Sequence, residues 1–552
     1  MAGLTKRVRR ARRMWPVAAL LAGAVLVGGC GGASGGPSTL GGDVSGGDGG
    51  GGGQGGTLTV AVASPTPTVD PALLTANPSY LWMAELAYDP LLWFAPDGSF
   101  KPGLATEWEY VGSGSRRFRL TLRSGVKFAD GTPVDAEAVA ASLRYSFKTG
   151  TTPLRAPGFR TARATGQSSV EISCSSACHS LPVLLSQNGL AGSIISPAGL
   201  RDTKRLGTQT FGAGPYVLNG GETVAGDHYT YDANPRYRNR SAVHYKRVVV
   251  RIVGDPNARV SSLTSGQADI IDYVPAELAK SVNTGANKLL PQPSGTVEMI
   301  FRDRTGRRHE GDPAGAKYNP PLAKVLVRQA LSYAVDRKAI TEGLGYGYFS
   351  PSVQWTAKGS GAYDPALESM YPYDPDKAKA LLAQAGHPNG FTLDVVTQKN
   401  NHADQWALAV ADYWEKIGVK VRLTTAPDVN VYYEAAQKSP VLFARYGAGS
   451  LPYSLEAVDY FGDGGAFSAY ETEPAMRSMI ARAAEAPPEQ TREIYLAINR
   501  RAVEQALSVG IAQFSYLYAY NAQKVNIPPL IEASEAGQLT NVAPILTNVT
   551  PK

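Results

Sequence analysis

YDPLLWFAPDGSFKPGLATEWEYVGSGSRRFRLTLRSGVKFADGTPVDAEAVAASLRYSF, residues 88–147, is the stretch that decides the fold. It predicts a unit of strands and turns that leads into a helix. The Pro-Asp-Gly sequence at 96–98 forms a turn, because proline presets its own φ and glycine accepts a positive φ. In residues 117–123 apolar and polar side chains alternate, and this period of two predicts a strand with one buried face.

A helix follows the strand. Asp135 occupies the position of its N-cap, and Val139, Leu143 and Phe147 recur every four residues on one face. The Lys-Thr-Gly sequence at 148–150 supplies a basic last turn and a glycine stop. This stretch therefore predicts a helix with one apolar face.

The same stretch carries a resemblance to a known family. It is similar to the signature region of the large extracellular solute-binding proteins of ABC importers, in family 5, which includes oligopeptide, dipeptide and nickel binders. Gly212-Ala213-Gly214-Pro215-Tyr216 and the run VRQALSYAVDRKAI at 327–340 also resemble family patterns. The resemblance covers roughly residues 57–527 and identifies the family, not the ligand.

The first 29 residues are predicted to be an export signal. Residues 1–29 contain six basic residues and no acid, followed by an apolar run at about 15–27. That run is shorter than the ~20 residues that a membrane span needs. It ends in small residues before Cys30, which resembles a bacterial lipobox with Cys30 as the lipid attachment site. Ordinary secretion with an unrelated cysteine and export by the twin-arginine route are the alternatives.

Residues 30–56 are predicted to be a tether. The segment is mostly glycine and lacks an apolar pattern, so it cannot offset the entropy of ordering. A flexible chain of this length spans on the order of 30 Å. That reach holds a globular body clear of a membrane to which its N-terminus is anchored.

Chain length and net charge limit the possible architectures and partners. At 552 residues the chain is too long for one ordinary core, so two or more lobes are expected. The formal charge is +7, but the first 29 residues account for six of these charges and leave +1 for the rest. A nucleic-acid partner is therefore not expected.

Cys174 and Cys178 are the remaining cysteines, with His179 beside them. A metal site is one interpretation, but a zinc site needs four ligands and the chain has no second cluster. Export favours a local disulfide between Cys174 and Cys178 instead, which requires the segment to turn there. We expect no metal and no cofactor.

The C-terminal half predicts a second α/β part. Strand patterns at 391–397 and 419–423 flank a helix pattern at 403–417, and strand-helix-strand order implies a parallel sheet. Residues 295–302 are the expected first crossing between lobes. Residues 509–520 are the expected return crossing.

The resemblance implies the architecture. The implied fold class is α/β, a two-lobed periplasmic-binding-protein-like fold of type II, cluster C, with an extra subdomain inserted in the first lobe. The expected boundaries are a lipoprotein signal peptide at 1–29, a tether at 30–56, lobe I at 57–298 with the subdomain at about 89–205, lobe II at 299–510, and a return to lobe I with a tail at 511–552.

Catalytic patterns occur only at chance level. Ser-x-x-Lys at 124–127 and Lys-Thr-Gly at 148–150 lie too close together for a penicillin-binding enzyme. His309-Glu310 does not extend to His-Glu-x-x-His, and the chain contains no Gly-Lys dipeptide and so no Walker A motif. The chain is not expected to be an enzyme, and ATP hydrolysis would belong to separate subunits.

Ligand contacts are expected between the lobes, on loops that follow strands. Aromatic residues with a polar tip suit a pocket that must both stack and form hydrogen bonds. The candidates are Asn77 and Tyr80 in the first lobe, and Trp355, Gln398, Asn400, Tyr446, Ser450 and Tyr453 in the second.

The sequence departs from the family at one place. Peptide-binding members carry a Trp-x-x-Asp-like segment whose acid pairs with the peptide's α-amino group. In this chain Tyr446 falls at the tryptophan and Gly449 near the acid. A buried ammonium without a counter-charge is costly. The sequence therefore favours an uncharged, capped or non-peptide ligand over a peptide with a free α-amino group.

The expected function is that of a monomeric, lipid-anchored binding protein on the outer face of a bacterial cell membrane. It would capture a peptide or another small polar solute and deliver it to ABC permease subunits with separate ATPase subunits. A ligand-presenting receptor of the same fold and a secreted hydrolase are the alternatives.

Overall fold

The computed structural model describes residues 55–74, 77–95, 99–150, 152–156, 158–309, 312–358, 360–399, 402–427, 429–446, 457, 460–462, 472–486, 488–527 and 546–552. Residues Gly53–Lys552 form one compact unit. The expected signal peptide, Cys30 and nearly all of the expected tether lie outside the described residues. The lobe boundaries drawn from the sequence stay a prediction.

One large sheet organises this unit. Within the described residues it has eleven strands, in the order β15-β14-β16-β12-β17-β11-β1-β10-β9-β8, with β13 paired to β17. Its strands are β1 (Gly55–Val62), β8 (Tyr216–Leu218), β9 (His228–Ala233), β10 (Tyr245–Ile252), β11 (Ile270–Ile271), β12 (Asn287–Phe301), β13 (Phe349–Pro351), β14 (Thr392–Gln398), β15 (Lys420–Ala426), β16 (Val441–Tyr446) and β17 (Ser508–Asn521).

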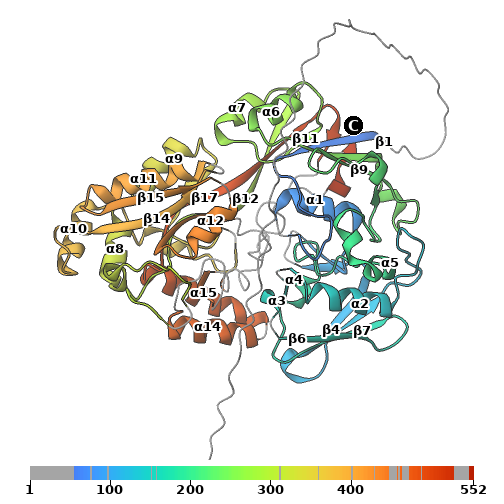
Figure 1. The fold of residues 1–552 in the computed structure, drawn as a ribbon, viewed down its shortest axis with the longest axis horizontal. Helices are drawn as coiled ribbons and strands as arrows, with labels where there is room; N and C mark the ends of the chain where they lie inside the picture. The colour runs from blue at the N-terminus through green and yellow to red at the C-terminus, as the bar shows by residue number, and fades with distance from the viewer. Residues whose placement is uncertain are drawn as a thin grey trace, which may run out of the picture. The chain divides into compact units, whose positions relative to one another are not determined.

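The sheet contains two groups of parallel strands. In the first region, β1 runs parallel to β10 and β11. In the second region, β14 runs parallel to β15 and β16, as the strand-helix-strand pattern predicts. Figure 1 shows the second region on the left and the first region on the right, with β12 and β17 extending between them.

The strands β12 and β17 form the crossing pair. They are antiparallel over almost their whole length, from Asn287↔Asn521 to Ile300↔Ser508. β17 also pairs with β11 of the first region, and β12 pairs with β16 of the second. The two crossings predicted at 295–302 and 509–520 lie within or at the ends of these strands, which begin earlier and pair more extensively than the sequence indicates.

Helices cover both faces of the second region. On one face, β12 residues such as Met299 pack in a core cluster with α8, α9 and α11. On the other face, Ile300 packs in a second cluster with α12, α14 and α15. The helices are α8 (Val325–Tyr333), α9 (Arg337–Leu344), α10 (Pro375–Gln384), α11 (Ala403–Glu415), α12 (Val429–Ala436), α14 (Pro474–Glu485) and α15 (Pro488–Glu504).

The first region is also covered on both faces. Helix α1 (Pro78–Ala87) packs Trp82 and Leu86 on Leu58 and Val60 of β1. Helices α6 (Pro256–Thr264) and α7 (Ala279–Val282) pack on the other face. The C-terminal residues Leu546 and Val549 join the α1 cluster, and β18 (Val525–Asn526) pairs with β19 (Thr550–Pro551).

Two strands from residues 88–147 and two later strands form a separate small sheet. Its four strands, in the order β4-β5-β7-β6, are β4 (Ala105–Tyr110), β5 (Arg117–Leu122), β6 (Phe159–Ala164) and β7 (Ser169–Cys174). Helix α2 (Ala136–Ser146) packs on it and begins where the sequence predicts, because the Asp135 carboxylate accepts a hydrogen bond from Ala138 N at 2.9 Å. The side chains predicted to face the core, among them Phe118, Leu120, Val139 and Leu143, are buried.

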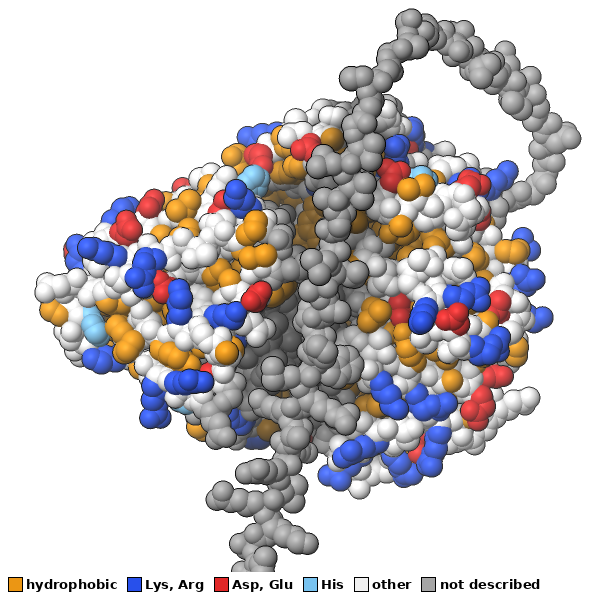
Figure 2. Space-filling model, viewed as in Figure 1, with side chains coloured by type: hydrophobic (Ala, Val, Ile, Leu, Met, Phe, Trp, Pro, Cys, Tyr) orange, Lys and Arg blue, Asp and Glu red, His pale blue; other side chains and the backbone are white. Residues whose placement is uncertain are grey.

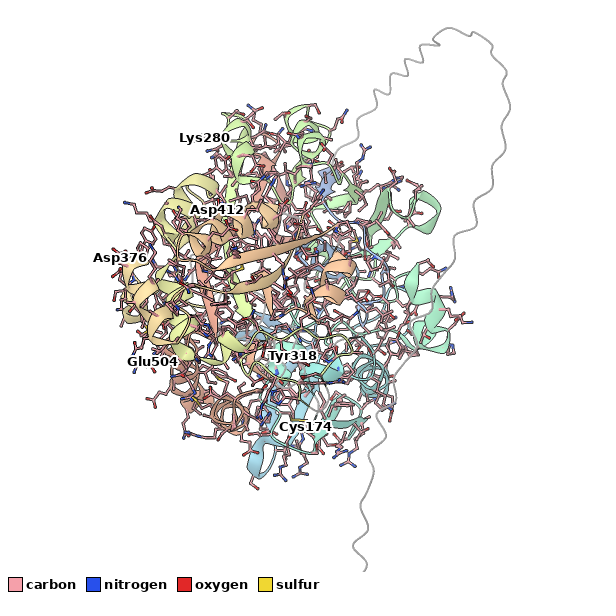
Figure 3. The ribbon with its side chains drawn as sticks, turned by 60° about the vertical axis from the view of Figure 1, so that its left-hand side comes forward. Cys174, Lys280, Tyr318, Asp376, Asp412 and Glu504 are labelled. Carbon is pink, nitrogen blue, oxygen red and sulfur yellow. A yellow bond between two sulfur atoms is a disulfide. The ribbon has the colours of Figure 1, made fainter. Side chains whose placement is uncertain are left out.

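Short elements complete this part of the chain. They are β2 (Leu92–Phe94), β3 (Phe100–Pro102), α3 (Thr152–Arg155), α4 (Leu181–Leu184) and α5 (Pro197–Arg201). Cys174 and Cys178 are joined in a disulfide with their Cα atoms 6.4 Å apart. Figure 3 labels Cys174 at the small sheet, well away from Asp376 and Asp412 of the second region.

The Gly-x-Gly-Pro-Tyr motif has a steric cause. A Cβ atom on Gly212 would lie 2.1 Å from Ala87 O, and one on Gly214 would lie 2.3 Å from Ala87 C. No side chain fits against the end of α1 at that distance. The two glycines therefore let the chain that leads into β8 pass directly beside α1.

Charges are mixed across the surface. On the face shown in Figure 2, Lys and Arg side chains are interspersed with Asp, Glu and uncharged side chains. On the small sheet Glu109, Arg119, Glu171 and Arg163 alternate across four adjacent strands, with N···O distances of 3.1, 3.8 and 3.3 Å. Opposite charges at paired positions favour this register. No helix in the described part of the chain is long and apolar enough to cross a membrane.

Candidate functional site

The carboxyl ends of the first-region strands point toward the middle of the crossing pair. In β11, Ile270 pairs with Tyr520 and Ile271 with Ala519, and beyond the strand Val274 N donates to Leu517 O. The chain that leaves β11 therefore moves along β17 toward its centre. In parallel α/β sheets, ligands bind at the carboxyl edge of the strands.

The carboxyl ends of the second-region strands point toward the same place. Tyr446, the last residue of β16, pairs with Thr296 of β12. Thr296 lies next to a register shift between Pro293 and Gly295, in the middle of the crossing pair. The two carboxyl edges therefore converge there, and we take their convergence as the candidate site.

The first wall of the site is built on the N-terminus of α1. The Asn77 side chain caps the helix by accepting from Ser79 N at 2.9 Å. Asp272, directly after β11, accepts from Ser79 Oγ at 2.5 Å and from Ala63 N at 2.8 Å. These contacts tie α1 to the carboxyl ends of β1 and β11.

Asp272 is fully buried, and Arg259 lies 3.5 Å from it. Burial raises the pKa of Asp272 to about 6, although Arg259, Ser79 and the backbone N–H of Ala63 act to lower it. The predicted contact residue Tyr80 donates its hydroxyl to Pro65 O at 3.2 Å. The polar groups named on this wall are thus engaged within the protein.

The second wall centres on Trp355, which is 1% exposed. Its carbonyl oxygen lies 3.4 Å from Thr296 Oγ1 of the crossing pair. Its ring packs edge-on against Phe461 at 5.1 Å and tilted against Tyr460 at 5.5 Å. Trp355 therefore lies beside the carboxyl end of β16, close to the candidate site.

Several buried polar atoms of this wall have no hydrogen-bond partner within the described residues. They are Trp355 Nε1, Thr356 Oγ1, Ser360 Oγ, Thr397 Oγ1, Gln398 Oε1 and Asn499 Oδ1. Gln398 is the last residue of β14 and a contact residue predicted from the sequence. Buried polar groups without partners are rare in proteins, and a bound ligand is one way to satisfy them.

Glu298, a buried acid on the crossing pair, is not among the site residues predicted from the sequence. Glu298 accepts from Thr296 Oγ1 at 2.8 Å and from Ser508 Oγ at 2.5 Å. Burial raises the pKa of its carboxyl, against the opposite effect of the hydroxyls of Ser508, Thr296 and Tyr460. An acid inside the apolar run GTVEMIF is the sequence signal that points to it.

Arg445 is a second residue that the sequence reasoning misses. Its guanidinium carbon lies 4.3 Å from the ring centre of Phe514 and 5.1 Å from that of Phe349. Burial lowers its pKa, while the nearby Tyr516, Tyr273 and Glu277 act to raise it. Arg445 of the second region therefore interacts with residues that follow β11 of the first.

A contact between a histidine and a carboxylate also links the two regions. His402 Nε2, before α11, lies 3.0 Å from Glu277 Oε1, which follows β11. Both side chains are partly exposed, at 50% and 35%. The contact lies between the chain segments that leave the two groups of parallel strands.

Other residues predicted to contact ligand cannot be placed. Asn400, Ser450 and Tyr453 lie outside the described residues. For Tyr446 the backbone is described, as the end of β16, but the side chain is not. Within the described residues, no group of three or more His, Cys, Asp or Glu side chains could hold a metal ion.

Two groups of parallel strands whose carboxyl edges converge on a crossing pair define a mixed α/β periplasmic-binding-protein fold. The model for bacterial extracellular solute-binding proteins, family 5 Middle, matches residues 99–467. The match covers more than half of the chain, and the chain belongs to this family of solute-binding proteins, which are not enzymes.

Curated relatives bind different solutes. The chain is 28% identical over 389 residues to heme-binding protein A of Haemophilus influenzae, covering 64% of this chain and 67% of that protein. It is 27% identical over 381 residues to the probable D,D-dipeptide-binding periplasmic protein DdpA of Escherichia coli, covering 66% and 69%. It is 27% identical over 376 residues to the glutathione-binding protein GsiB of the same species, covering 66% and 68%.

Solved structures share the fold at lower identity. AgaA of A. tumefaciens R10, in complex with agropinic acid, matches with a TM-score of 0.73 at 24% identity, covering 90% of this chain and 99% of that one. DppA of Helicobacter pylori, in complex with the peptide STSA, matches with a TM-score of 0.72 at 18% identity, covering 90% and 98%.

Proposed function

We propose that this protein is the lipid-anchored solute-binding component of an ABC importer, which captures a peptide-like or other small polar solute and delivers it to a membrane permease. The observation that carries the proposal is the convergence of two carboxyl edges on the crossing pair. Membership of the solute-binding family supports it, and separate permease and ATPase subunits would complete the importer.

Capture follows from the connection between the two regions. A solute that contacts both walls binds the closed arrangement better than the open one, and this differential affinity shifts the protein toward closure. The paired strands β12 and β17 are continuous between the regions, and the register shifts at Pro293/Gly295 and Val297/Glu298 interrupt their regular ladder. Irregular points of this kind are where a hinge motion can concentrate.

Two observations support the proposed class of solute. The relatives named above include dipeptide and glutathione binders, and the candidate contacts Trp355 and Gln398 bring buried, uncharged hydrogen-bonding groups to the second wall. A peptide-like solute presents amide groups that match them. The Gly449 position, where peptide binders carry an acid, favours a solute without a free α-amino group at that point.

The anchor is proposed from Cys30 at the end of the apolar N-terminal run. A multiply acylated cysteine gives stable membrane attachment, which a single short chain does not. Cys30→Ser is expected to release the protein into the soluble fraction of cells. Retention of Cys30→Ser in the membrane fraction would rule out this anchor.

The experiment that tests solute binding is native mass spectrometry of the full chain purified without denaturation. A bound small molecule that is released unchanged on denaturation is the expected result. Its identity would then be checked by thermal shift with the purified compound, alongside glutathione and the dipeptide Met-Leu. A protein that carries no small molecule and responds to no compound would contradict the proposal.

A further inference from the structure

One atom of the second wall stands out among the buried polar groups. Trp355 is 1% exposed, yet its indole Nε1 has no hydrogen-bond partner in the part of the chain that the structure describes. An indole N–H has no acceptor lone pair and forms a hydrogen bond only as donor. Leaving it buried and unpaired costs stability, so its retention calls for a reason.

Trp414 shows what a structural tryptophan does in this fold. It is also fully buried in the second region, on the other face of the sheet, and its Nε1 donates to Leu331 O at 2.9 Å. The packing of Trp355 resembles that of Trp414, because both rings lie among aromatic neighbours. The two residues differ in whether a described residue supplies an acceptor for the indole N–H.

The segment around Trp355 carries both neutral polar atoms and charged side chains, among them Glu368, which accepts from Gln354 Nε2 at 2.6 Å. The Trp355 loop, residues 352–358 and 360–364, is held by Asn499 of α15, whose Nδ2 donates to Gln354 Oε1 at 2.6 Å and to Ala362 O at 2.8 Å. Asn499 Oδ1, Thr356 Oγ1 and Ser360 Oγ are buried without partners in the described residues. The loop thus gathers neutral donors and acceptors that have no partner among the described residues.

Acids beside the Trp355 loop limit which solute groups it can bind. Thr296 Oγ1 contacts both Glu298 Oε1 at 2.8 Å and Trp355 O at 3.4 Å, which places the Glu298 carboxyl close to the loop. An anionic group of a solute would lose its hydration there and approach two acids, Glu298 and Glu368. A neutral carbonyl oxygen accepts a hydrogen bond without these costs.

We propose that the Trp355 loop is the subsite for a neutral carbonyl group of the solute, with Trp355 Nε1 donating to its oxygen. This inference rests on the proposed function and specifies the solute as one that presents an amide, ester or ketone carbonyl to the second wall. The solute reaches Trp355 when the two regions separate, and closure buries the new hydrogen bond.

The first test compares Trp355→Phe with Trp414→Phe in the full chain freed of solute. Both changes shrink the ring equally, so the difference between them reports the indole hydrogen bond. Trp414→Phe should melt lower than Trp355→Phe by about 1–3 °C, because only Trp414 loses a bond to the protein. Equal losses in the two variants would show that Trp355 Nε1 has a structural partner and would overturn the inference.

The second test measures binding by calorimetry with tri-alanine and with its N-acetyl amide as probes. Trp355→Phe should weaken binding of a probe about 5- to 100-fold, since the probe's carbonyl then lies buried without a donor. Trp414→Phe should bind like the wild type. Unchanged affinity in Trp355→Phe would overturn the subsite, which is then filled by water alone.

The outcomes separate the two proposals. If the wild type carries no solute in native mass spectrometry and binds no compound, the proposed function fails. If the wild type binds a solute but Trp355→Phe binds it equally well, only the subsite fails. If neither alanine probe binds, the melting comparison of the two tryptophan variants still decides whether Trp355 Nε1 is unpaired in the solute-free protein.

Discussion

The two walls of the candidate site use their polar groups in opposite ways. On the first wall, Ser79 and Asp272 are fully buried and bonded to each other, and Asn77 caps α1. On the second wall, Trp355 and Thr397 are as deeply buried, but Trp355 Nε1 and Thr397 Oγ1 have no partner in the described residues. The polar groups of the first wall are paired with other protein groups, whereas several on the second wall have no partner among the described residues.

This difference indicates which wall contributes more to the binding free energy of a solute. A group already bonded to the protein must give up that bond before it binds a solute, so its net contribution is small. A buried group without a partner loses nothing and gains a full hydrogen bond. The second wall should therefore determine solute affinity, and the first wall should determine stability.

The largest expected effect comes from breaking the first wall at Arg259. This residue donates Nε to Asp272 O at 2.9 Å and Nη2 to Tyr273 O at 2.9 Å, and it is 3% exposed. Arg259→Met should lower the free energy of unfolding by about 3–5 kcal/mol, because several buried acceptors and the Asp272 carboxyl lose their partner.

A matched control for Arg259→Met is Arg422→Met. Arg422 is also in an ion pair, 2.6 Å from Asp394, but its side chain is 70% exposed. Because exposed ion pairs contribute little to stability, its loss should destabilise the protein much less than the loss of Arg259. Denaturant unfolding that gives the same loss for both variants would contradict the assignment of Arg259 as a structural cation.

The second-largest expected effect is a pH dependence of the free energy of unfolding. It arises in α1, the helix that builds the first wall. Glu85 accepts from Thr547 Oγ1 at 3.4 Å, and burial raises its pKa to about 8, although the hydrogen bonds from Thr547 and Leu546 act to lower it. The folded state therefore favours the protonated carboxyl. Its contribution to stability is present below pH ~4.5 and is lost as the pH rises through about 8.

Glu85→Gln removes this titration. Between pH 5 and 9 the wild type should lose on the order of 3 kcal/mol of unfolding free energy relative to Glu85→Gln. The two proteins should be most alike at pH 5. Parallel stability curves over this range would show that Glu85 is not held protonated in the fold.

A smaller effect compares one hydroxyl from each wall. Ser79→Ala removes the donor to Asp272 and should cost about 1–2 kcal/mol. Thr397→Val removes a buried hydroxyl that has no partner among the described residues and should be neutral or stabilise the protein by up to about 1 kcal/mol. Thermal unfolding that ranks the two variants in the reverse order would break the comparison.

The smallest effect is expected at the His402–Glu277 contact between the regions. His402 and Glu277 lie 3.0 Å apart and are both partly exposed, so a double-mutant cycle with Glu277→Gln and His402→Gln should give a coupling of about 0.2–1 kcal/mol. The coupling should shrink at high salt. A coupling of several kcal/mol would make this pair, and not the walls, the main contact between the regions.

Much of the fold could be predicted from local sequence patterns. The alternation around Phe118 and the Asp135 cap fix a strand and a helix whose residues are adjacent in the chain. Helix α1 is less predictable from the sequence, because it begins at Pro78, directly after the Asn77 cap, in a segment rich in loop-forming residues.

The site could be predicted only in part. Trp355 and Gln398 are aromatic or polar residues after strands, so they fit a general rule. Glu298 and Arg445 matter because strands about 150 residues apart pair in one register, Val297 opposite Arg445 and Glu298 opposite Ala444. No local pattern encodes that pairing, and the partners of Asp272 depend on the same kind of long-range contact.

The measurement that tests the central claim most directly is hydrogen–deuterium exchange of the full chain with and without its co-purified solute. If the solute is held where the two carboxyl edges converge, its binding should slow exchange both in residues 63–80 of the first wall and in the Trp355 loop at 352–358 and 360–364. Protection confined to one of these segments, or found only elsewhere in the molecule, would contradict a site shared by the two regions.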